Sequence, residues 1–315
     1  MVIKHRVMPL LWVALLSGCG GAPRAEEPLL GGVRAVPWMT ITGAPLVQVT
    51  AAGAPLNFSG PYTRLVAPVA VAARGNDVLI ADPGLGRVVR MDLGLNVMNV
   101  LQGAVARPDT KLYLSPDGVA YVTDSARREV TRYGRNGQLL QRLRSDDLLS
   151  KPVGVAVDER SGRVWVGDGL IHQLVMFHPA GRAVIAVPMR GGNDGPQSVA
   201  ALTAGSNGLY VVDALCPCVF RLAENGSVLA TIGRGTLRQP AAVATDRHGR
   251  VYVLDRFVNR IMVFVGEQIV GYLEAPAGMP MESIFVDGSM MYIASSLGSR
   301  VDVLRLLDAP ARVQQ

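Results

Sequence analysis

The sequence predicts an all-β protein: a six-bladed β-propeller with four strands in each blade and a ring closed by an N-terminal strand. Three observations lead to this fold. The 315 residues are 49% hydrophobic and 18% charged, which excludes a disordered chain. The 35 Gly and 20 Pro favour short strands and tight turns over long helices. Beyond residue 66 a strand-rich unit recurs six times, and a repeat of this length is typical of propellers and solenoids.

Each unit is marked by a proline and, further on, by a strand that ends in aspartate. The prolines lie 40 to 44 residues apart, at Pro68, Pro108, Pro152, Pro196, Pro240 and Pro280. The strands end at Asp82, Asp124, Asp168, Asp213 and Asp255, with Ser295 in the sixth unit. We expect each aspartate to accept hydrogen bonds from backbone N–H groups two residues on, and so to fix the next turn. Four antiparallel strands fill a unit of this length, which makes it one propeller blade.

The unit resembles the NHL repeat, in which Pro-x-Gly-apolar-Ala-Val-Asp is followed by Gly-x-Val-Tyr-Val-Ala-Asp and a turn that ends in Arg. The units PVGVAVD (152–158) and PAAVATD (240–246) match best, and the resemblance covers residues 66–306. It implies an NHL-type propeller of six blades. The sixth unit lacks a fourth strand. We expect residues 46–58 to supply it, because joining the two chain ends removes an exposed sheet edge.

The N-terminus has the organisation of a secretory signal. Basic residues 4–6 precede ten apolar residues, 7–16, which are too few to cross a bilayer. The run Leu16-Ser17-Gly18-Cys19 resembles the lipobox of bacterial lipoproteins. That resemblance implies cleavage before Cys19, a diacylglycerol thioether on its sulfur, and an acyl chain such as palmitate on the new amino terminus. Several acyl chains anchor a protein stably to a membrane. Gly20, where Asp would imply inner-membrane retention, favours the outer membrane facing the periplasm.

Four segments are therefore expected along the chain. Residues 1–18 form the signal peptide, and residues 19–45 hold the lipidated cysteine and a flexible tether. The tether is rich in Gly and Pro, which leave little room for regular structure. The propeller fills residues 46–308, and residues 309–315 form a C-terminal tail.

Cys216 and Cys218 are the thiols that remain when Cys19 is lipidated. Outside the inner membrane the envelope is oxidising, so we interpret the pair as a structural disulfide. A redox pair or a soft-metal site is the alternative, because a strained, exposed bridge is readily reduced. Histidines of the mature chain lie in or beside turns of different units, and we interpret them as solvated rather than as zinc ligands: His172, His178 and His248.

Two carboxylates, Asp109 and Glu282, follow the repeating prolines closely enough to lie near the ring axis. Such a pair could bind a cation such as Ca²⁺ in the central channel. The two residues belong to the second and sixth blades, which are not adjacent. The alternative is that both face solvent at the channel mouth and accept hydrogen bonds from turn N–H groups. No other cofactor is expected.

Five arginines belong to the turns between the second and third strands, which share one face of the disc: Arg87, Arg127, Arg128, Arg260 and Arg300. A basic face could meet an acidic protein surface or an anionic envelope polymer. Arginine at this repeat position equally serves to brace the turn. An exported protein does not meet RNA, and an aromatic content of 5% argues against a stacking platform, so no nucleic-acid partner is expected.

The leading hypothesis for function is a membrane-anchored envelope lipoprotein. Its propeller would act as a non-catalytic scaffold that binds a protein or a peptide. The alternative hypothesis is a metal-dependent lyase or lactonase that acts at the channel mouth.

Overall fold

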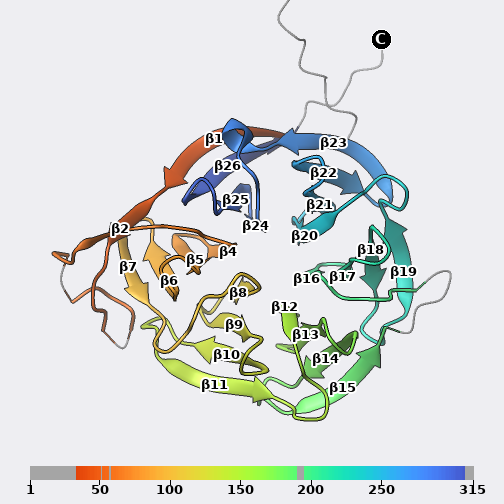
Figure 1. Ribbon diagram of the computed structural model, residues 1–315, viewed down its shortest axis with the longest axis horizontal. Helices are drawn as coiled ribbons and strands as arrows, with labels where there is room; N and C mark the ends of the chain where they lie inside the picture. The colour runs from red at the N-terminus through yellow and green to blue at the C-terminus, as the bar shows by residue number, and fades with distance from the viewer. Residues whose placement is uncertain (1–32, 51, 57, 190–194, 309–315) are drawn as a thin grey trace, which may run out of the picture.

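The computed structural model describes residues 33–308 except 51, 57 and 190–194. Six four-stranded antiparallel sheets stand around a central axis (Figure 1), which confirms the six-bladed β-propeller. Each sheet has its first strand nearest the axis and its fourth strand at the rim. Within the described residues, no helix is long and apolar enough to span a membrane. Cys19, the signal peptide and the tail 309–315 lie outside these residues.

The strands follow the chain blade by blade. Blade 1 contains β4 (Ala70–Arg74), β5 (Asp77–Asp82), β6 (Arg87–Asp92) and β7 (Val97–Val100). Blade 2 contains β8 (Leu112–Leu114), β9 (Ala120–Asp124), β10 (Glu129–Tyr133) and β11 (Leu139–Arg144). Blade 3 contains β12 (Pro152–Val157), β13 (Val164–Asp168), β14 (Gln173–Phe177) and β15 (Ala183–Pro188).

Blade 4 contains β16 (Ala201–Gly205), β17 (Gly208–Asp213), β18 (Cys218–Leu222) and β19 (Val228–Ile232). Blade 5 contains β20 (Pro240–Thr245), β21 (Arg250–Asp255), β22 (Arg260–Val265) and β23 (Gln268–Glu274). Blade 6 contains β24 (Ser283–Asp287), β25 (Met290–Ser295), β26 (Arg300–Asp308) and the N-terminal β1 (Val33–Ile41). A short 3₁₀ helix, η1 (Pro276–Gly278), links blades 5 and 6.

The N-terminal strand that closes the ring is β1, which pairs antiparallel with β26 from Val33 opposite Asp308 to Ile41 opposite Val301. This confirms that an N-terminal strand closes the ring, but the predicted segment, 46–58, is wrong. The tether predicted over 19–45 also extends too far, because β1 and β2 (Gly43–Pro45) lie within it. Pro37 made this strand hard to predict from the sequence, because proline is uncommon within strands. Pro37 lies at a register shift in an outer strand, a position at which a sheet tolerates proline.

The chain after β1 packs on blade 1 instead. β2 pairs with β3 (Tyr62–Arg64), and Leu46 forms a bridge with Met98 of β7. The Val47 N–H donates to the Met98 carbonyl at 2.8 Å. This segment therefore covers the short outer strand of blade 1 rather than completing blade 6.

The hydrophobic core is divided into six clusters, one at each junction between adjacent blades. The cluster between blades 5 and 6 contains the fully buried Tyr252 together with Ile293, and it also receives Val33 from β1. Each sheet is apolar on both faces, and a single blade cannot bury both alone. All six clusters are covered only when the ring is closed.

The aspartates that end the second strands join separate segments of each blade. The buried Asp168 accepts hydrogen bonds from the backbone N–H groups of Ser150 and Lys151, before the first strand of blade 3. It also accepts from Leu170 at 2.8 Å and Ile171 at 3.0 Å, in the turn after the strand. The predicted turn-fixing role is confirmed, and Asp168, Asp213 and Asp255 in addition accept backbone hydrogen bonds from the connection that leads from the preceding blade.

The meander gives the disc two different faces. We call the face with the turns between second and third strands the aspartate face, because those turns follow the six aspartate or serine positions. The opposite face carries the turns between first and second strands, and we call it the hairpin face. Its turns are 75–76, 115–119, 158–163, 206–207, 246–249 and 288–289.

Candidate functional site: a pocket on the hairpin face

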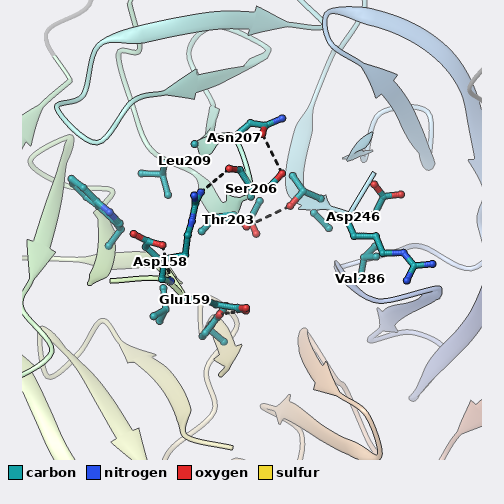
Figure 2. Close-up of a pocket in the computed structure, with 18 of the residues that line it drawn as sticks. Asp158, Glu159, Thr203, Ser206, Asn207, Leu209, Asp246 and Val286 are labelled. Carbon is teal, nitrogen blue, oxygen red and sulfur yellow. Dashed lines mark hydrogen bonds between the residues drawn. The ribbon is translucent and has the colours of Figure 1, made fainter. Parts of the chain in front are cut away.

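A pocket of about 540 Å³ lies on the hairpin face, between turns of blades 3, 4 and 5 (Figure 2). This volume falls within the range of small-molecule and peptide-side-chain sites. All six blades contribute to the lining: Arg74, Tyr113, residues 157–160, Trp165, residues 203–209, Ala223, Glu224, Leu229, residues 244–247, Phe285, Val286 and Gly288.

The unequal hairpin turns shape the pocket. Blade 4 has the short turn 206–207, whereas its neighbours have the longer turns 158–163 and 246–249. The two longer turns therefore extend on either side of the short one. Backbone and small side chains of residues 203–208 form the wall between them.

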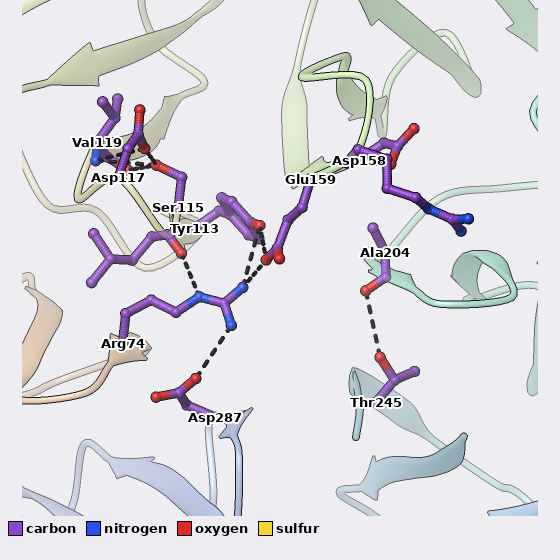
Figure 3. Close-up of polar contacts among 12 residues, drawn as sticks. Arg74, Tyr113, Ser115, Asp117, Val119, Asp158, Glu159, Ala204, Thr245 and Asp287 are labelled. Atoms are coloured by element: carbon purple, nitrogen blue, oxygen red, sulfur yellow. Dashed lines mark hydrogen bonds and ion pairs between the residues drawn. The ribbon is translucent and has the colours of Figure 1, made fainter. Parts of the chain in front are cut away.

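A network centred on Arg74 forms another wall and joins four blades (Figure 3). The guanidinium of Arg74 pairs with Glu159 of blade 3 and with Asp287 of blade 6, the latter at 3.2 Å. Its Nε donates to the Leu114 carbonyl at 3.2 Å. The Tyr113 hydroxyl donates to Glu159 Oε1 at 2.8 Å. These contacts hold charges of both signs at fixed positions beside the pocket.

The electrostatics of this network keep Tyr113 and Arg74 in their ordinary protonation states. Burial raises the pKa of the Tyr113 hydroxyl, and the neighbouring Glu159 carboxylate raises it further. Burial acts to lower the pKa of Arg74, but Tyr113, Glu159 and Asp287 outweigh it and raise that pKa. At neutral pH the tyrosine is therefore neutral and the arginine charged.

The wall formed by blades 3, 4 and 5 is held by contacts to backbone carbonyls. Arg160 Nη2 donates to the Ser206 carbonyl at 2.9 Å, and the Thr245 hydroxyl donates to the Ala204 carbonyl at 3.4 Å. Burial opposes ionisation of Asp158, but a hydrogen bond from the Ser161 hydroxyl at 2.6 Å and backbone N–H donors outweigh it. The pKa of Asp158 is lowered as a result, so this carboxylate is charged at neutral pH.

Asp246, at the blade 5 side of the pocket, is enclosed by partners. Its Oδ2 accepts hydrogen bonds from Arg250 Nε at 2.6 Å and from the Tyr252 hydroxyl at 3.0 Å. Burial raises the pKa of Tyr252, and the carboxylate of Asp246 adds to the effect. Asp246 thus orders the base of the turn 246–249.

Below the pocket the axis narrows to a channel of about 50 Å³, lined by the first strands of the blades. Lys111 lies on this channel toward the aspartate face. Burial lowers the pKa of its ammonium group, and the positive charge of Arg256 lowers it further against the opposing effect of Glu282 and Asp109. Four charged side chains therefore meet at this mouth of the channel.

The predicted cation site at Asp109 and Glu282 belongs to this mouth. Glu282 accepts hydrogen bonds from Arg256 Nη2 at 2.6 Å and from the Ser296 hydroxyl at 2.8 Å. A cation at this carboxylate would have to displace the guanidinium. Residues 33–308, as far as they are described, contain no group of three or more His, Cys, Asp or Glu that could hold a metal ion. Calcium binding in the channel stays a prediction.

The five predicted arginines lie on the aspartate face, and four of them contact other parts of the fold. Arg128 donates to the Leu149 carbonyl at 3.3 Å and the Asp146 carbonyl at 3.0 Å. The other three form ion pairs: Arg127 with Asp124, Arg260 with Glu274 and Arg300 with Asp302. Arg87 is exposed at the start of β6. These contacts favour the turn-bracing interpretation over a basic docking face.

Cys216 and Cys218 lie in the aspartate-face turn of blade 4. Their sulfurs are 2.7 Å apart, and both cysteines are free thiols in this structure. The structure therefore brings the pair together, as the disulfide prediction requires, and bond formation itself stays a prediction. The mature-chain histidines lie in turns or beside them, but not all on different blades, because His172 and His178 flank β14 of blade 3 and His248 lies in a turn of blade 5.

Sequence reasoning missed the hairpin-face pocket. Arg74, Tyr113 and Glu159 come from three blades and occupy positions outside the repeated motif. One feature of the sequence could have located the pocket, namely the variation in length of the turns between first and second strands. Turns whose length varies between blades are not constrained by the repeat and are free to form a binding site.

No protein-family model matches the chain, and no curated protein matches it. Solved structures do. Virginiamycin B lyase from Staphylococcus aureus, in a catalytically inactive form with quinupristin, has a TM-score of 0.59 at 14% identity, covering 87% of this chain and 99% of that one. A streptogramin B lyase gives 0.59 at 12% identity, covering 80% and 84%. A protein of unknown function from Bacteroides thetaiotaomicron gives 0.60 at 16%, covering 87% and 76%. At these identities the likeness shows the propeller fold alone.

Proposed function

We propose that this chain is a membrane-anchored envelope lipoprotein whose NHL-type propeller binds a protein or peptide ligand, without chemical turnover, in the hairpin-face pocket. One observation carries the proposal: the pocket receives side chains or backbone from all six blades, most of them from blades 3, 4 and 5. A site built from the whole ring has a fixed shape, which lowers the entropy cost of binding.

The lining has the mixed chemistry that a peptide requires. It combines the cations Arg74, Arg160 and Arg247 with carboxylates such as Glu159 and Glu224. Leu229, which is 49% exposed, and the backbone of residues 203–208 add apolar contact and hydrogen-bonding groups. A peptide offers charges of both signs, amide groups and apolar side chains to such a surface.

The charged groups of the pocket are arranged as fixed partners rather than as proton-transfer groups. Glu159 is held by Arg74 and Tyr113, and Asp246 is held by Arg250. A general acid or base works best with a pKa near the operating pH. The pKa of Tyr113 is raised and that of Asp158 is lowered, so both move further from neutral pH. This favours ligand recognition over proton transfer.

A bulky residue at the pocket rim tests the binding site. Ser206 is exposed in the short turn of blade 4, and Ser206→Trp should fill the space that the ligand occupies. We expect the yield of protein captured by chemical crosslinking in native membranes to fall by about tenfold, as for a loss of about 1.4 kcal/mol. The matched control is Ala126→Trp, an exposed turn position on the aspartate face, which should retain full capture. Equal loss in both variants, or none in either, would reject the site.

The anchor rests on the lipobox resemblance at Cys19 and is tested separately. Cys19→Ala should leave an uncleaved precursor or release the protein from membranes, as measured by fractionation with acyl labelling. A variant that is still cleaved and still acylated would end the lipoprotein assignment. Outer-membrane sorting predicts that the wild-type protein fractionates with the outer membrane.

The second candidate is a metal-dependent lyase or lactonase, and the lyases among the similar structures favour it. Its discriminating measurement is the metal content of the purified mature protein. A stoichiometric divalent cation that is lost in Asp109→Ala/Glu282→Ala, together with a lost metal-dependent activity, would establish the enzyme and overturn the scaffold.

A further inference from the structure

One aspartate-face turn differs in backbone geometry from the other five. The fourth residue after the aspartate or serine position has a positive φ in five blades: Gly86 (66°), Arg128 (56°), His172 (50°), Asn259 (51°) and Ser299 (50°). In blade 4 that position is Pro217. Proline fixes φ near −65° and cannot adopt the left-handed conformation. Blade 4 must therefore close its turn in another way.

The two residues that flank this proline are the cysteines. Cys218 is the first residue of β18 and is completely buried, whereas Cys216 is partly exposed in the turn. The Cys216 N–H donates to Asp213 Oδ1 at 3.1 Å, which holds the turn against the end of β17. The two sulfurs are in contact at 2.7 Å. Thiolates that share one tetrahedral metal ion, at about 2.3 Å each, stand about 3.8 Å apart, so the contact favours a direct bond over a metal site.

We propose that Cys216 and Cys218 are a covalent modification site, at which thiol–disulfide exchange forms a disulfide across Pro217 and so replaces the left-handed residue of the other turns. The co-reactant is an oxidised disulfide, of which glutathione disulfide is the simplest example. This inference does not depend on the ligand of the hairpin-face pocket.

Exchange proceeds in two steps. The Cys216 thiol loses a proton, and its thiolate attacks one sulfur of the co-reactant; an S–S bond forms to Cys216 while the co-reactant's own S–S bond breaks and releases one thiolate. The Cys218 thiol then loses its proton and attacks Cys216 Sγ, which releases the second thiolate and leaves the Cys216–Cys218 bond. Two electrons pass to the co-reactant, which leaves as two thiols after taking up the two protons.

The difference in exposure assigns the order of attack. Cys216 is accessible to a co-reactant, and Cys218 is enclosed in the core cluster between blades 3 and 4. Burial also raises the pKa of the Cys218 thiol, and the adjacent Cys216 raises it further, which makes Cys218 the weaker first nucleophile. Cys216 therefore attacks first and Cys218 resolves the mixed disulfide.

The first test is mass spectrometry of the full chain after exposure to glutathione disulfide. Trypsin cleavage after Arg190 and Arg221 leaves both cysteines in one peptide, 191–221, apart from Cys19. We expect this peptide to be lighter by two hydrogen atoms and to resist alkylation until a reductant is added. Free, alkylatable thiols after the same exposure would overturn the proposal.

Single variants test the order of attack. Cys218→Ser should accumulate a stable mixed disulfide of Cys216 with one glutathione, whereas Cys216→Ser should acquire glutathione at least several-fold more slowly. Equal rates in the two variants would overturn the assigned roles, and no adduct in either would overturn the exchange chemistry.

Pro217→Asn restores a residue that blade 5 uses at the same position. The turn can then close without the sulfur bond. We expect the equilibrium constant for oxidation by glutathione disulfide to fall by about two- to fivefold, the usual effect of losing a well-placed proline. An unchanged or larger constant would overturn the inference that Pro217 holds the two thiols together.

Discussion

At the scale of single residues, the buried aspartates at the ends of the second strands connect consecutive blades. Asp255 accepts hydrogen bonds from the N–H groups of Arg238 at 2.7 Å and Gln239 at 3.1 Å, which lead into blade 5. It also accepts from Phe257 at 3.0 Å in the following turn. Hydrogen bonds to an ionised acceptor are about twice as strong as neutral ones. Asp255 therefore fixes both a turn and a blade-to-blade connection.

Asp168→Ala should destabilise the protein far more than Ser295→Ala. Asp168→Ala leaves four buried backbone N–H groups without their acceptor. We therefore expect the free energy of unfolding to fall by about 3 kcal/mol or more. Ser295 accepts a hydrogen bond from the Gly298 N–H at 3.2 Å, so its loss should cost about 1 kcal/mol. Urea unfolding of both variants measures the difference. An equal loss of stability in the two variants would show that Asp168 stabilises its turn and connection no more than Ser295 stabilises its turn.

Lys111 gives a pH-dependent prediction. Burial lowers its folded pKa below the ordinary 10.5, so the charged form destabilises the fold at pH values below the folded pKa. Stability recovers as the pH rises through the folded pKa toward 10.5, because the unfolded chain then binds the extra proton. Lys111→Met should therefore be more stable than the wild type at neutral pH, and its advantage should shrink near pH 10.5. Urea midpoints at the two pH values test this; a variant less stable at neutral pH would contradict it.

The sequence allowed the turn-fixing role of the aspartates to be predicted, because they recur at a fixed place in the repeat, but it did not predict their hydrogen bonds to the connection that precedes each blade. The network of Arg74, Tyr113 and Glu159 could not be predicted in the same way. Its members come from three blades and meet only at the ring axis. Their contacts depend on the curvature of the closed ring, which the repeat pattern does not specify residue by residue.

At the scale of elements, β1 determines whether the ring is closed. It covers the open edge of β26, and it buries Val33 and Ile41, which lie in different core clusters. The sequence showed that a strand was missing from the sixth unit but not where it lay. Pro37 and the surrounding glycines resemble a linker, whereas residues 46–58 have the apolar alternation of a strand. Pairing with β26 outweighs those local preferences.

Deleting residues 33–41 should therefore be much more damaging than deleting residues 52–56. Loss of two buried aliphatic side chains alone costs about 3–6 kcal/mol, and the exposed edge of β26 promotes association. The deletion protein should unfold at lower urea and form soluble oligomers, as measured by size-exclusion chromatography. If both deletions unfold at the same urea concentration and remain monomeric, the ring closes without β1.

At the scale of the whole molecule, ring closure builds the candidate site as well as the fold. Arg74 of blade 1 pairs with Asp287 of blade 6, across the junction where the chain's first and last blades meet. The period of the repeat was sufficient to predict six blades and two distinct faces. The arginines predicted as a binding face from the repeat lie on the aspartate face, because the motif residues lie there. The pocket formed on the opposite face, from turns whose lengths differ between blades.

If the proposed function is correct, a protein or peptide binds in the hairpin-face pocket. The most direct measurement places a photoreactive amino acid at position 206, and in a second protein at position 126, and irradiates native membranes that contain the full chain. We predict a discrete, saturable adduct from position 206, which is lost when Arg160 is changed to Glu, and no corresponding adduct from position 126. A discrete adduct from position 126 with none from position 206 would show that the ligand does not bind in the hairpin-face pocket.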